Sequence, residues 1–317
     1  MARPLLVAVL GPTATGKSAL ALALAERYKG EIINCDSTAV YRRFDSGTDK
    51  VPLEARRGIP HHLIDIVDPV DEYTAAQYAK DAASAVRRIH GRGKLPILVG
   101  GTGFYYRALT RGLFPGPGRD AGLRARLEAI GMRRRGQTLH RLLRRIDPAS
   151  AARIQSRDVK RIVRALEVFY LTGRPLTEHF AETRSPLADV DVLAIGLRLA
   201  AARISERVVR RVDEQFARGL IDEVRDLLAS GVPETARPFG GLVYRQVLEH
   251  LRGLRDEKGT RALIAQENRQ YARRQLIWFR KEPNLTWLEG PGEAAAVIAA
   301  AQQVLDTRLL DDARRPR

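Results

Sequence analysis

The chain has 317 residues, of which 44% are hydrophobic and 29% are charged, a composition typical of a globular protein with about two domains. A formal net charge of +17 favours a polyanionic partner such as nucleic acid. The sequence has no apolar run of 18 residues and a single cysteine, Cys35, so we expect no membrane-spanning helix, no intramolecular disulfide and no cysteine-rich zinc site.

A phosphate-binding motif lies near the start of the chain. Residues 4–10 form an apolar run that predicts a buried strand, and residues 19–28 predict a helix. Between them, GPTATGKS has the P-loop spacing G-x-x-x-x-G-K-[ST], whose backbone amides suit a phosphate or diphosphate. Lys17 is expected to contact the terminal phosphate and Ser18 to bind Mg²⁺. The predicted phosphate ligands are Gly11, Pro12, Thr13, Ala14, Thr15, Gly16, Lys17 and Ser18.

The rest of the chain predicts an α/β fold with one helical interruption. Further buried strands are predicted at 31–35, 63–67, 95–99, 192–197 and 285–288. Helical patterns separate most of them, which favours a P-loop core with a mostly parallel sheet flanked by helices. Residues 118–185 show only helical periodicity and carry 16 Arg and Lys against 7 Asp and Glu. We therefore expect a core of residues 1–117 and 186–317 with an all-helical, basic insertion domain at 118–185, whose charge suits nucleic acid.

Two predicted strand ends bear on the chemistry. The strand at 95–99 is followed by Gly100, Gly101 and Thr102, although ordinary P-loop phosphotransferases place a magnesium-binding acid at such a strand end. The strand at 31–35 ends at Asp36, on the sheet edge where ligands bind. Asp36 could act as a general base, hold Mg²⁺ or cap a helix. From these residues alone, a kinase of a small nucleotide or metabolite and an RNA-binding module without chemistry both remain open.

Nine motifs extend the pattern over residues 5–289. In chain order they are GPTATGKS, DSTAVY, SGTDK, PHHLIDIVDP, YTAAQYAKDA, LVGGTGFYYRAL, DVKRIVRALEVFYLTGRPLTE, GLIDEVRDLL and YRQVLEHL. This series resembles the bacterial tRNA dimethylallyltransferases. The resemblance implies a cytoplasmic, Mg²⁺-dependent enzyme, expected to be monomeric. It would move a prenyl group from dimethylallyl diphosphate to the exocyclic amine of the tRNA adenine on the 3′ side of the anticodon.

The resemblance also implies residue roles. Asp36 matches the general base, Thr102 a residue that orients the base and the amine, and Arg211 a second diphosphate ligand. Contacts with the anticodon stem-loop are implied for Asp36, Ser37, Thr38, Ala39, Thr102, Arg124, Lys160, Arg161, Ile162, Val163, Arg164, Tyr244 and Arg245. The chain departs from the family at Thr38 and Ala39, and at Val243, where a glycine is usual.

Two further stretches complete the expectations. Residues 266–281 predict a helix with a basic face formed by Arg269, Arg273 and Arg280, and with Leu276, Ile277 and Phe279 in the core. His61 and His62 match a family motif, and we expect them to have a structural or hydrogen-bonding role.

Overall fold

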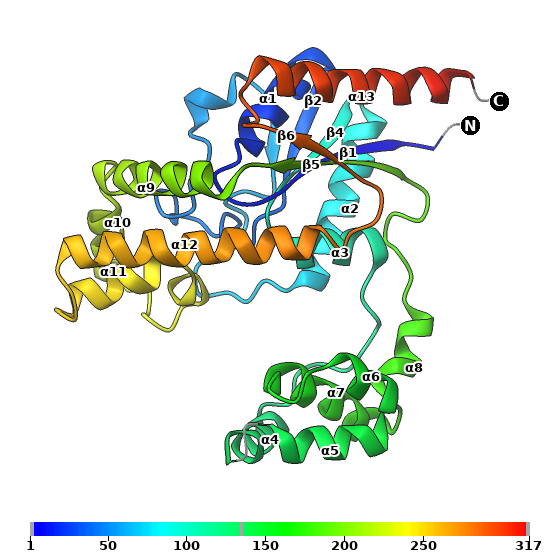
Figure 1. Cartoon of the computed structure of the whole chain (residues 1–317), viewed down its shortest axis with the longest axis vertical. Helices are drawn as coiled ribbons and strands as arrows, with labels where there is room; N and C mark the ends of the chain where they lie inside the picture. Colours follow the sequence, from blue (N-terminus) through cyan, green and yellow to red (C-terminus); the bar gives the residue numbers. More distant parts are fainter. Residues whose placement is uncertain (1–2, 134–135, 315–317) are drawn as a thin grey trace. The chain divides into compact units, whose positions relative to one another are not determined.

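The computed structural model describes residues 3–133 and 136–314 (Figure 1). Six strands form one sheet in the order β3-β2-β4-β1-β5-β6, and every described strand pair is parallel. This confirms the predicted α/β fold. The strands are β1 Leu5–Leu10, β2 Gly30–Asn34, β3 His61–His62, β4 Leu95–Gly100, β5 Asp191–Arg198 and β6 Leu285–Glu289.

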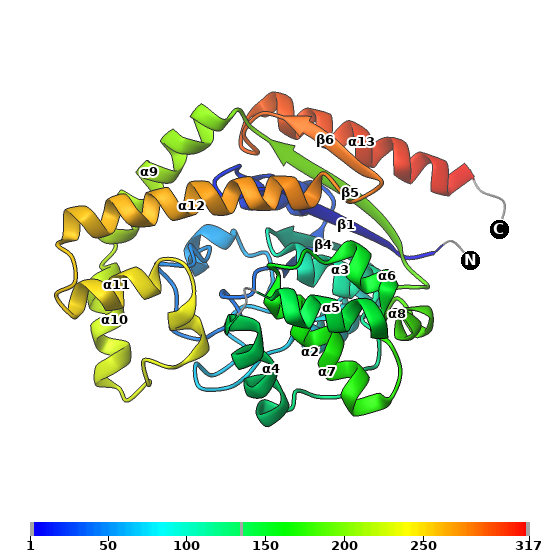
Figure 2. The ribbon, with the colours of Figure 1, turned by 60° about the horizontal axis from the view of Figure 1, so that its bottom comes forward.

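Helices cover both faces of the sheet, so β1 is buried along its whole length. Leu5, Val7 and Val9 pack with α1 and α13, whereas the alternate side chains of β1 pack with α2, α3 and helices further along the chain. Figures 1 and 2 show α9 and α12 running side by side. The helices that accompany the sheet are α1 Lys17–Arg27, α2 Ala75–Gly91, α3 Gly103–Arg111, α9 Ala201–Ala217, α10 Leu220–Ala229, α11 Tyr244–Leu251, α12 Glu257–Phe279 and α13 Ala295–Arg314, with 3-10 turns η1 Leu53–Arg56 and η3 Arg237–Gly240.

One predicted strand is wrong. Residues 63–67 do not form a strand, because Leu63 and Asp65 have positive φ values of 61° and 56°. The sheet instead ends at the two-residue β3, while Val67 makes only an isolated bridge with Tyr41. Leu63 and Val67 are nevertheless buried, so the apolar pattern marked core residues rather than a strand.

The described chain divides into two compact units, and the second consists of Arg111–Ser185. It begins seven residues before the expected insertion. Its described residues form α4 Ala121–Arg133, α5 Gln137–Ile146, α6 Pro148–Arg153, α7 Val159–Thr172, α8 Leu176–His179 and the 3-10 turn η2 Phe180–Glu182. This unit has its own core, in which Leu139, Leu143, Ile162 and Leu166 are fully or almost fully buried.

All-parallel pairing brings the carboxyl ends of the strands to one edge of the sheet. The P-loop follows β1, Asp36 lies two residues beyond β2, and Thr102 lies two residues beyond β4. Because β4 lies between β1 and β2, these three segments are neighbours. None of the helices in the described part of the chain is long and apolar enough to cross a bilayer.

Candidate active site

The P-loop is held in shape by groups outside it. Gly11 has φ 142°, and a Cβ there would lie 2.7 Å from the carbonyl oxygen of Leu197. Arg207 on α9 donates from Nε to the Ala14 carbonyl at 2.6 Å. The Gly292 amide donates to the Thr15 carbonyl at 2.9 Å. Arg207 and Gly292 thus hold the loop from two sides, in a shape that suits an anion.

Lys17 begins α1 and reaches back over the loop. Its Nζ donates to the Pro12 carbonyl at 2.6 Å. Burial lowers the pKa of Lys17 to about 7; the Arg211 charge also lowers this pKa, while Asp36 raises it. Ser18, the next residue, is exposed. A diphosphate bound to the P-loop would therefore contact the Lys17 ammonium group, and its negative charge would raise the pKa of Lys17 again.

The structure brings Arg211, the expected second diphosphate ligand, to the P-loop. Its Nη1 donates to Thr13 Oγ1 at 2.5 Å, and its Nε lies 2.8 Å from Asp49 Oδ2. Asp49 also accepts from Gln215 at 2.8 Å and pairs with Arg218 at 2.7 Å. Arg211 and Gln215 are four residues apart on α9 and so share one face of the helix. That spacing is the sequence signal by which this cluster could have been found.

Asp36 and Thr102 lie on adjacent loops that are hydrogen-bonded to each other. Thr102 Oγ1 accepts from the Ser37 amide at 3.1 Å, and the Thr102 amide donates to the Cys35 carbonyl at 3.1 Å. Asp36 Oδ1 accepts from the amides of Thr38 and Ala39 at 2.8 and 3.2 Å. Asp36 therefore caps a turn rather than a helix. Within residues 3–133 and 136–314, its Oδ2 has no hydrogen-bond partner.

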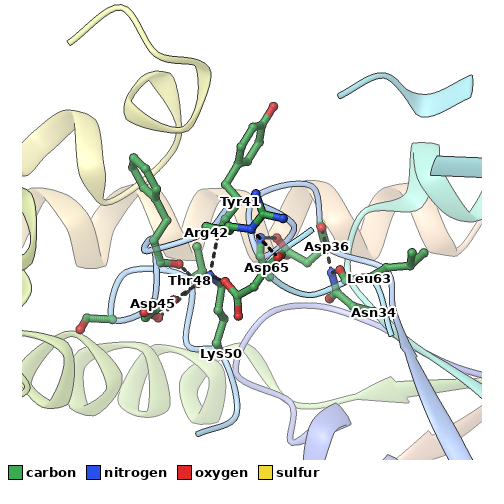
Figure 3. A network of polar contacts seen from close by, with 12 residues as sticks. Asn34, Asp36, Tyr41, Arg42, Asp45, Thr48, Lys50, Leu63 and Asp65 are labelled. Carbon is green, nitrogen blue, oxygen red and sulfur yellow. Dashed lines mark hydrogen bonds and ion pairs between the residues drawn. The ribbon is translucent and has the colours of Figure 1, made fainter. Parts of the chain in front are cut away.

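The loop after Asp36 is tied down by a polar network centred on Lys50 (Figure 3). The Lys50 side chain is only 5% exposed, and its Nζ donates to Asp45 at 2.6 Å, to Asp65 at 2.5 Å and to the Tyr41 carbonyl at 2.6 Å. Asn34 adds a second tie, since its amide donates to the carbonyls of Asp36 and Leu63. These contacts fix the path of the chain on both sides of Asp36.

Two α12 residues that were not predicted from the sequence also lie at the site. Gln275 accepts from the Thr13 amide at 2.8 Å and donates to the Gly101 carbonyl at 2.9 Å, so it joins the P-loop to the end of β4. Tyr271 interacts through its side chain with Thr102 and Gln275. Burial raises its pKa to about 12, and the nearby Asp36 charge also raises it. The four-residue spacing of these two polar residues was the available signal.

The two residues of α11 that were expected to contact RNA differ in their exposure to solvent. The Tyr244 side chain is fully buried, donates to Glu223 at 2.6 Å and packs edge-on against Phe44. The RNA contact expected at Tyr244 stays a prediction. Arg245 is half-exposed and pairs with Glu267 at 2.6 Å. Val243, where the family usually has glycine, has φ 78°, a strained value for a β-branched residue. The backbone here demands the conformation that glycine adopts freely.

In the helical unit, the side chains of Ile162 and Val163 are buried in the core. The RNA contacts expected at these two positions stay a prediction, and the buried side chains pack in the core instead of facing solvent. Arg124 and Arg164 both pair with the fully buried Glu167, at 2.8 and 2.7 Å, which limits their reach. Lys160 and Arg161 are exposed, and Arg161 pairs loosely with Asp158 at 3.4 Å.

The remaining expectations concern α12 and β3. Phe279 is buried as predicted, and Arg273 and Arg280 are exposed, whereas Arg269 and Leu276 are half-buried. Ile277 is 47% exposed, so its predicted core position is wrong. His61 Nδ1 lies 2.8 Å from the Ile59 carbonyl, and His62 Nε2 lies 2.7 Å from Glu31. Both histidines have the hydrogen-bonding role that we expected.

Comparison with known proteins agrees with this geometry. Residues 39–282 match the family model described as IPP transferase. The tRNA dimethylallyltransferase of Solibacter usitatus is 51% identical over 93% of this chain and 96% of its own length. That of Koribacter versatilis is 44% identical over 97% of this chain and all of its own length.

Solved structures give the same result. The full-length tRNA isopentenylpyrophosphate transferase of Bacillus halodurans is 35% identical, with a TM-score of 0.72 over 98% of both chains. A eukaryotic dimethylallyltransferase acting on tRNA is 26% identical, with a TM-score of 0.81 over 99% of this chain and 80% of its own. These matches leave the small-metabolite kinase without support. The chain belongs to the tRNA dimethylallyltransferase, or IPP transferase, family.

Proposed function

We propose that this chain transfers the dimethylallyl group of dimethylallyl diphosphate to the exocyclic amine of the tRNA adenine on the 3′ side of the anticodon. The observation that carries the proposal is the closeness of a carboxylate to an anion cradle. Asp36 lies near enough to Lys17 for its charge to oppose the lowering of the Lys17 pKa. The proposed proton acceptor and the proposed diphosphate-binding lysine thus lie at the same carboxyl edge of the sheet, close enough for their charges to interact.

Asp36 is the proposed general base. The adenine amine is a poor nucleophile, because its lone pair is delocalised into the ring. As the amine nitrogen bonds to the allylic carbon, the carbon–oxygen bond to diphosphate breaks and the amine proton passes to Asp36. Its Oδ2 is suited to this role, since Oδ1 already accepts from Thr38 and Ala39. General-base catalysis of this kind is worth ~10²–10⁴-fold in rate. Thr102 holds the Asp36 loop through the Ser37 amide.

The P-loop is the proposed site of the leaving group. Charge that builds on the departing diphosphate is stabilised by the loop amides of residues 11–16, by Lys17 and by Arg211. No group of three or more His, Cys, Asp or Glu side chains suited to a metal occurs in the described parts of the chain. The exposed Ser18 hydroxyl fits Mg²⁺ that takes its other oxygens from diphosphate and water, and such an ion would add positive charge beside the leaving group.

The anticodon stem-loop is the proposed RNA partner. A target base must leave its stack to reach Asp36, which costs least in a single-stranded loop. Ser37, Thr38, Ala39 and Thr102 border the base, although Ala39 is nearly buried. Exposed cations of the helical unit, including Lys160 and Arg161, supply backbone contacts. We propose further that the protein acts as a monomer in the cytoplasm.

The test is incubation of the protein with labelled dimethylallyl diphosphate, Mg²⁺ and unmodified tRNA, followed by nucleoside analysis. The expected product is an isopentenylated adenosine next to the anticodon. The Asp36→Asn protein is the matched control and should form little of it. Phosphate transfer from ATP without prenylation would support a kinase instead, and RNA binding without any product would support a binding module.

A further inference from the structure

The helical unit contains an open, basic hollow that no predicted site accounts for. It lies between α5, the end of α6 and the segment that leads to α7, and its volume is about 830 Å³. Arg141, Arg144 and Arg157 line it together with Gln137, Gln155 and His140. None of the described residues that line it is acidic.

The way α5 folds explains why these groups face outward together. Leu139 and Leu143 are buried in the core of the unit. Gln137, Arg141 and Arg144 follow the i, i+4, i+7 spacing and so form a stripe along another side of the helix. His140 joins α5 to the end of α6, because its Nε2 donates to the carbonyls of Ala151 and Ile154 at 3.1 and 2.8 Å. The hollow is therefore built on helices that are packed and hydrogen-bonded to each other.

The three arginines differ from others in the same unit by their lack of partners. Arg124 and Arg164 are bound to Glu167, and Arg174 pairs with Glu178 and Glu182. Within residues 136–185, and in the rest of the described chain, no hydrogen bond or ion pair involves the side chains of Arg141, Arg144 or Arg157. Three exposed guanidinium groups with no counter-charge suit an anion that presents several phosphates in a row.

We propose that this hollow binds the phosphodiester backbone of tRNA, through Arg141, Arg144 and Arg157. The inference rests on the proposed function, which makes RNA the available polyanion. According to this proposal, the main electrostatic contact between the helical unit and RNA is made by the arginines of the hollow. Arg124 and Arg164 contribute less, because both are paired with Glu167. Gln137 and Gln155 add neutral donors at the rim, which suits backbone contact rather than the reading of bases.

The experiment compares two charge-matched variants of the full chain. One carries Arg141→Gln, Arg144→Gln and Arg157→Gln. The control carries Arg126→Gln, Arg133→Gln and Arg184→Gln, which change exposed arginines of the same unit outside the hollow. The affinity for unmodified tRNA is measured over a range of salt concentrations. Each lost phosphate contact should flatten the log–log salt slope by ~0.7–0.9, so the first variant should lose about 2–3 units of slope and the control much less.

Other readouts separate this proposal from its rivals. Both variants should keep the wild-type melting temperature and affinity for dimethylallyl diphosphate. Equal loss in the two variants, or unchanged tRNA affinity, overturns the proposal even if the wild type prenylates tRNA. Weaker binding with an unchanged slope overturns the assignment to phosphates. If inorganic phosphate at constant ionic strength removes the difference between the variants, the hollow holds a free anion rather than RNA. A wild type that binds tRNA without prenylating it contradicts only the proposed function.

Discussion

Asp49 and Arg211 form an ion pair in which the carboxylate Oδ2 lies 2.8 Å from the guanidinium Nε. The same guanidinium reaches Thr13 of the P-loop through Nη1. Asp49 precedes Lys50, which ties the loop after Asp36 to Asp65. One short segment thus connects the loop of the proposed base with the arginine at the proposed diphosphate site, and Asp49 orients Arg211 by fixing one edge of its planar group.

We predict that Asp49→Asn weakens the binding of dimethylallyl diphosphate, because Arg211 loses the partner that orients it. A loss of about 0.5–1.5 kcal/mol is expected, typical of one hydrogen bond. Calorimetric titration of Asp49→Asn, Arg211→Gln and the double variant measures the coupling between the two residues. The effects should be clearly less than additive. Strictly additive effects would mean that Asp49 acts on the fold alone.

We predict that diphosphate binding depends on the protonation of Lys17. Burial and Arg211 lower the pKa of Lys17 to about 7 in the free protein, and a bound anion should raise it. The complex then holds a proton that the free protein has lost. Affinity should therefore fall as the pH rises above 7, by up to about tenfold per pH unit.

Lys17→Met provides the control for this pH dependence. It should bind dimethylallyl diphosphate more weakly by about 1.5–3 kcal/mol, as for a lost charged hydrogen bond. Its affinity should also vary less between pH 7 and pH 8.5 than that of the wild type. Identical pH profiles for the two proteins would assign the titration to another group.

We predict that Asp36→Asn slows prenyl transfer by at least ~10²-fold at saturating substrates, as expected for loss of a general base. Asparagine keeps an Oδ1 that can accept from Thr38 and Ala39, so the turn should survive. The readout is the single-turnover rate, with diphosphate affinity as the check on the fold. If Asp36→Asn keeps a near-normal rate while Asp36→Ala is slow, Asp36 acts only by capping the turn and is not the general base.

We predict that Glu167→Gln destabilises the helical unit by about 3 kcal/mol, because it breaks a buried cluster with two arginines. Hydrogen exchange of the α4 and α7 amides at pH 7 measures the change. Arg124 and Arg164 hold the pKa of Glu167 down at about 2, from an ordinary 4.5, against the opposing effect of burial. The stabilisation is complete above pH 4.5 and is lost as the pH falls toward 2, since the unfolded unit takes up the proton first. In Glu167→Gln this pH dependence of stability should disappear. If the substitution leaves hydrogen exchange of the α4 and α7 amides unchanged, Glu167 does not stabilise the unit through its two arginines.

Local patterns in the sequence determined the fold class, the P-loop, the positions of Asp36 and Thr102 at strand ends, and the family. Each of these depends on residues close together in the chain, such as GPTATGKS after an apolar run. Parallel pairing then has a predictable result, because strand ends must meet at one edge of the sheet. The burial of residues 63–67 was also readable, although their backbone conformation was not.

Only the tertiary structure decided which partner each polar group takes. Tyr244 lies in the core because Phe44, far away in the chain, packs against its ring and Glu223 accepts the proton of its hydroxyl group. Glu167 holds Arg124 and Arg164, whereas Arg141 and Arg144 of α5 have no ion pair or side-chain hydrogen bond within the described chain. Gln275 reaches the P-loop across 262 positions of sequence. Burial and pairing of this kind depend on contacts between distant segments, and neither periodicity nor motif spacing along the chain specifies such contacts.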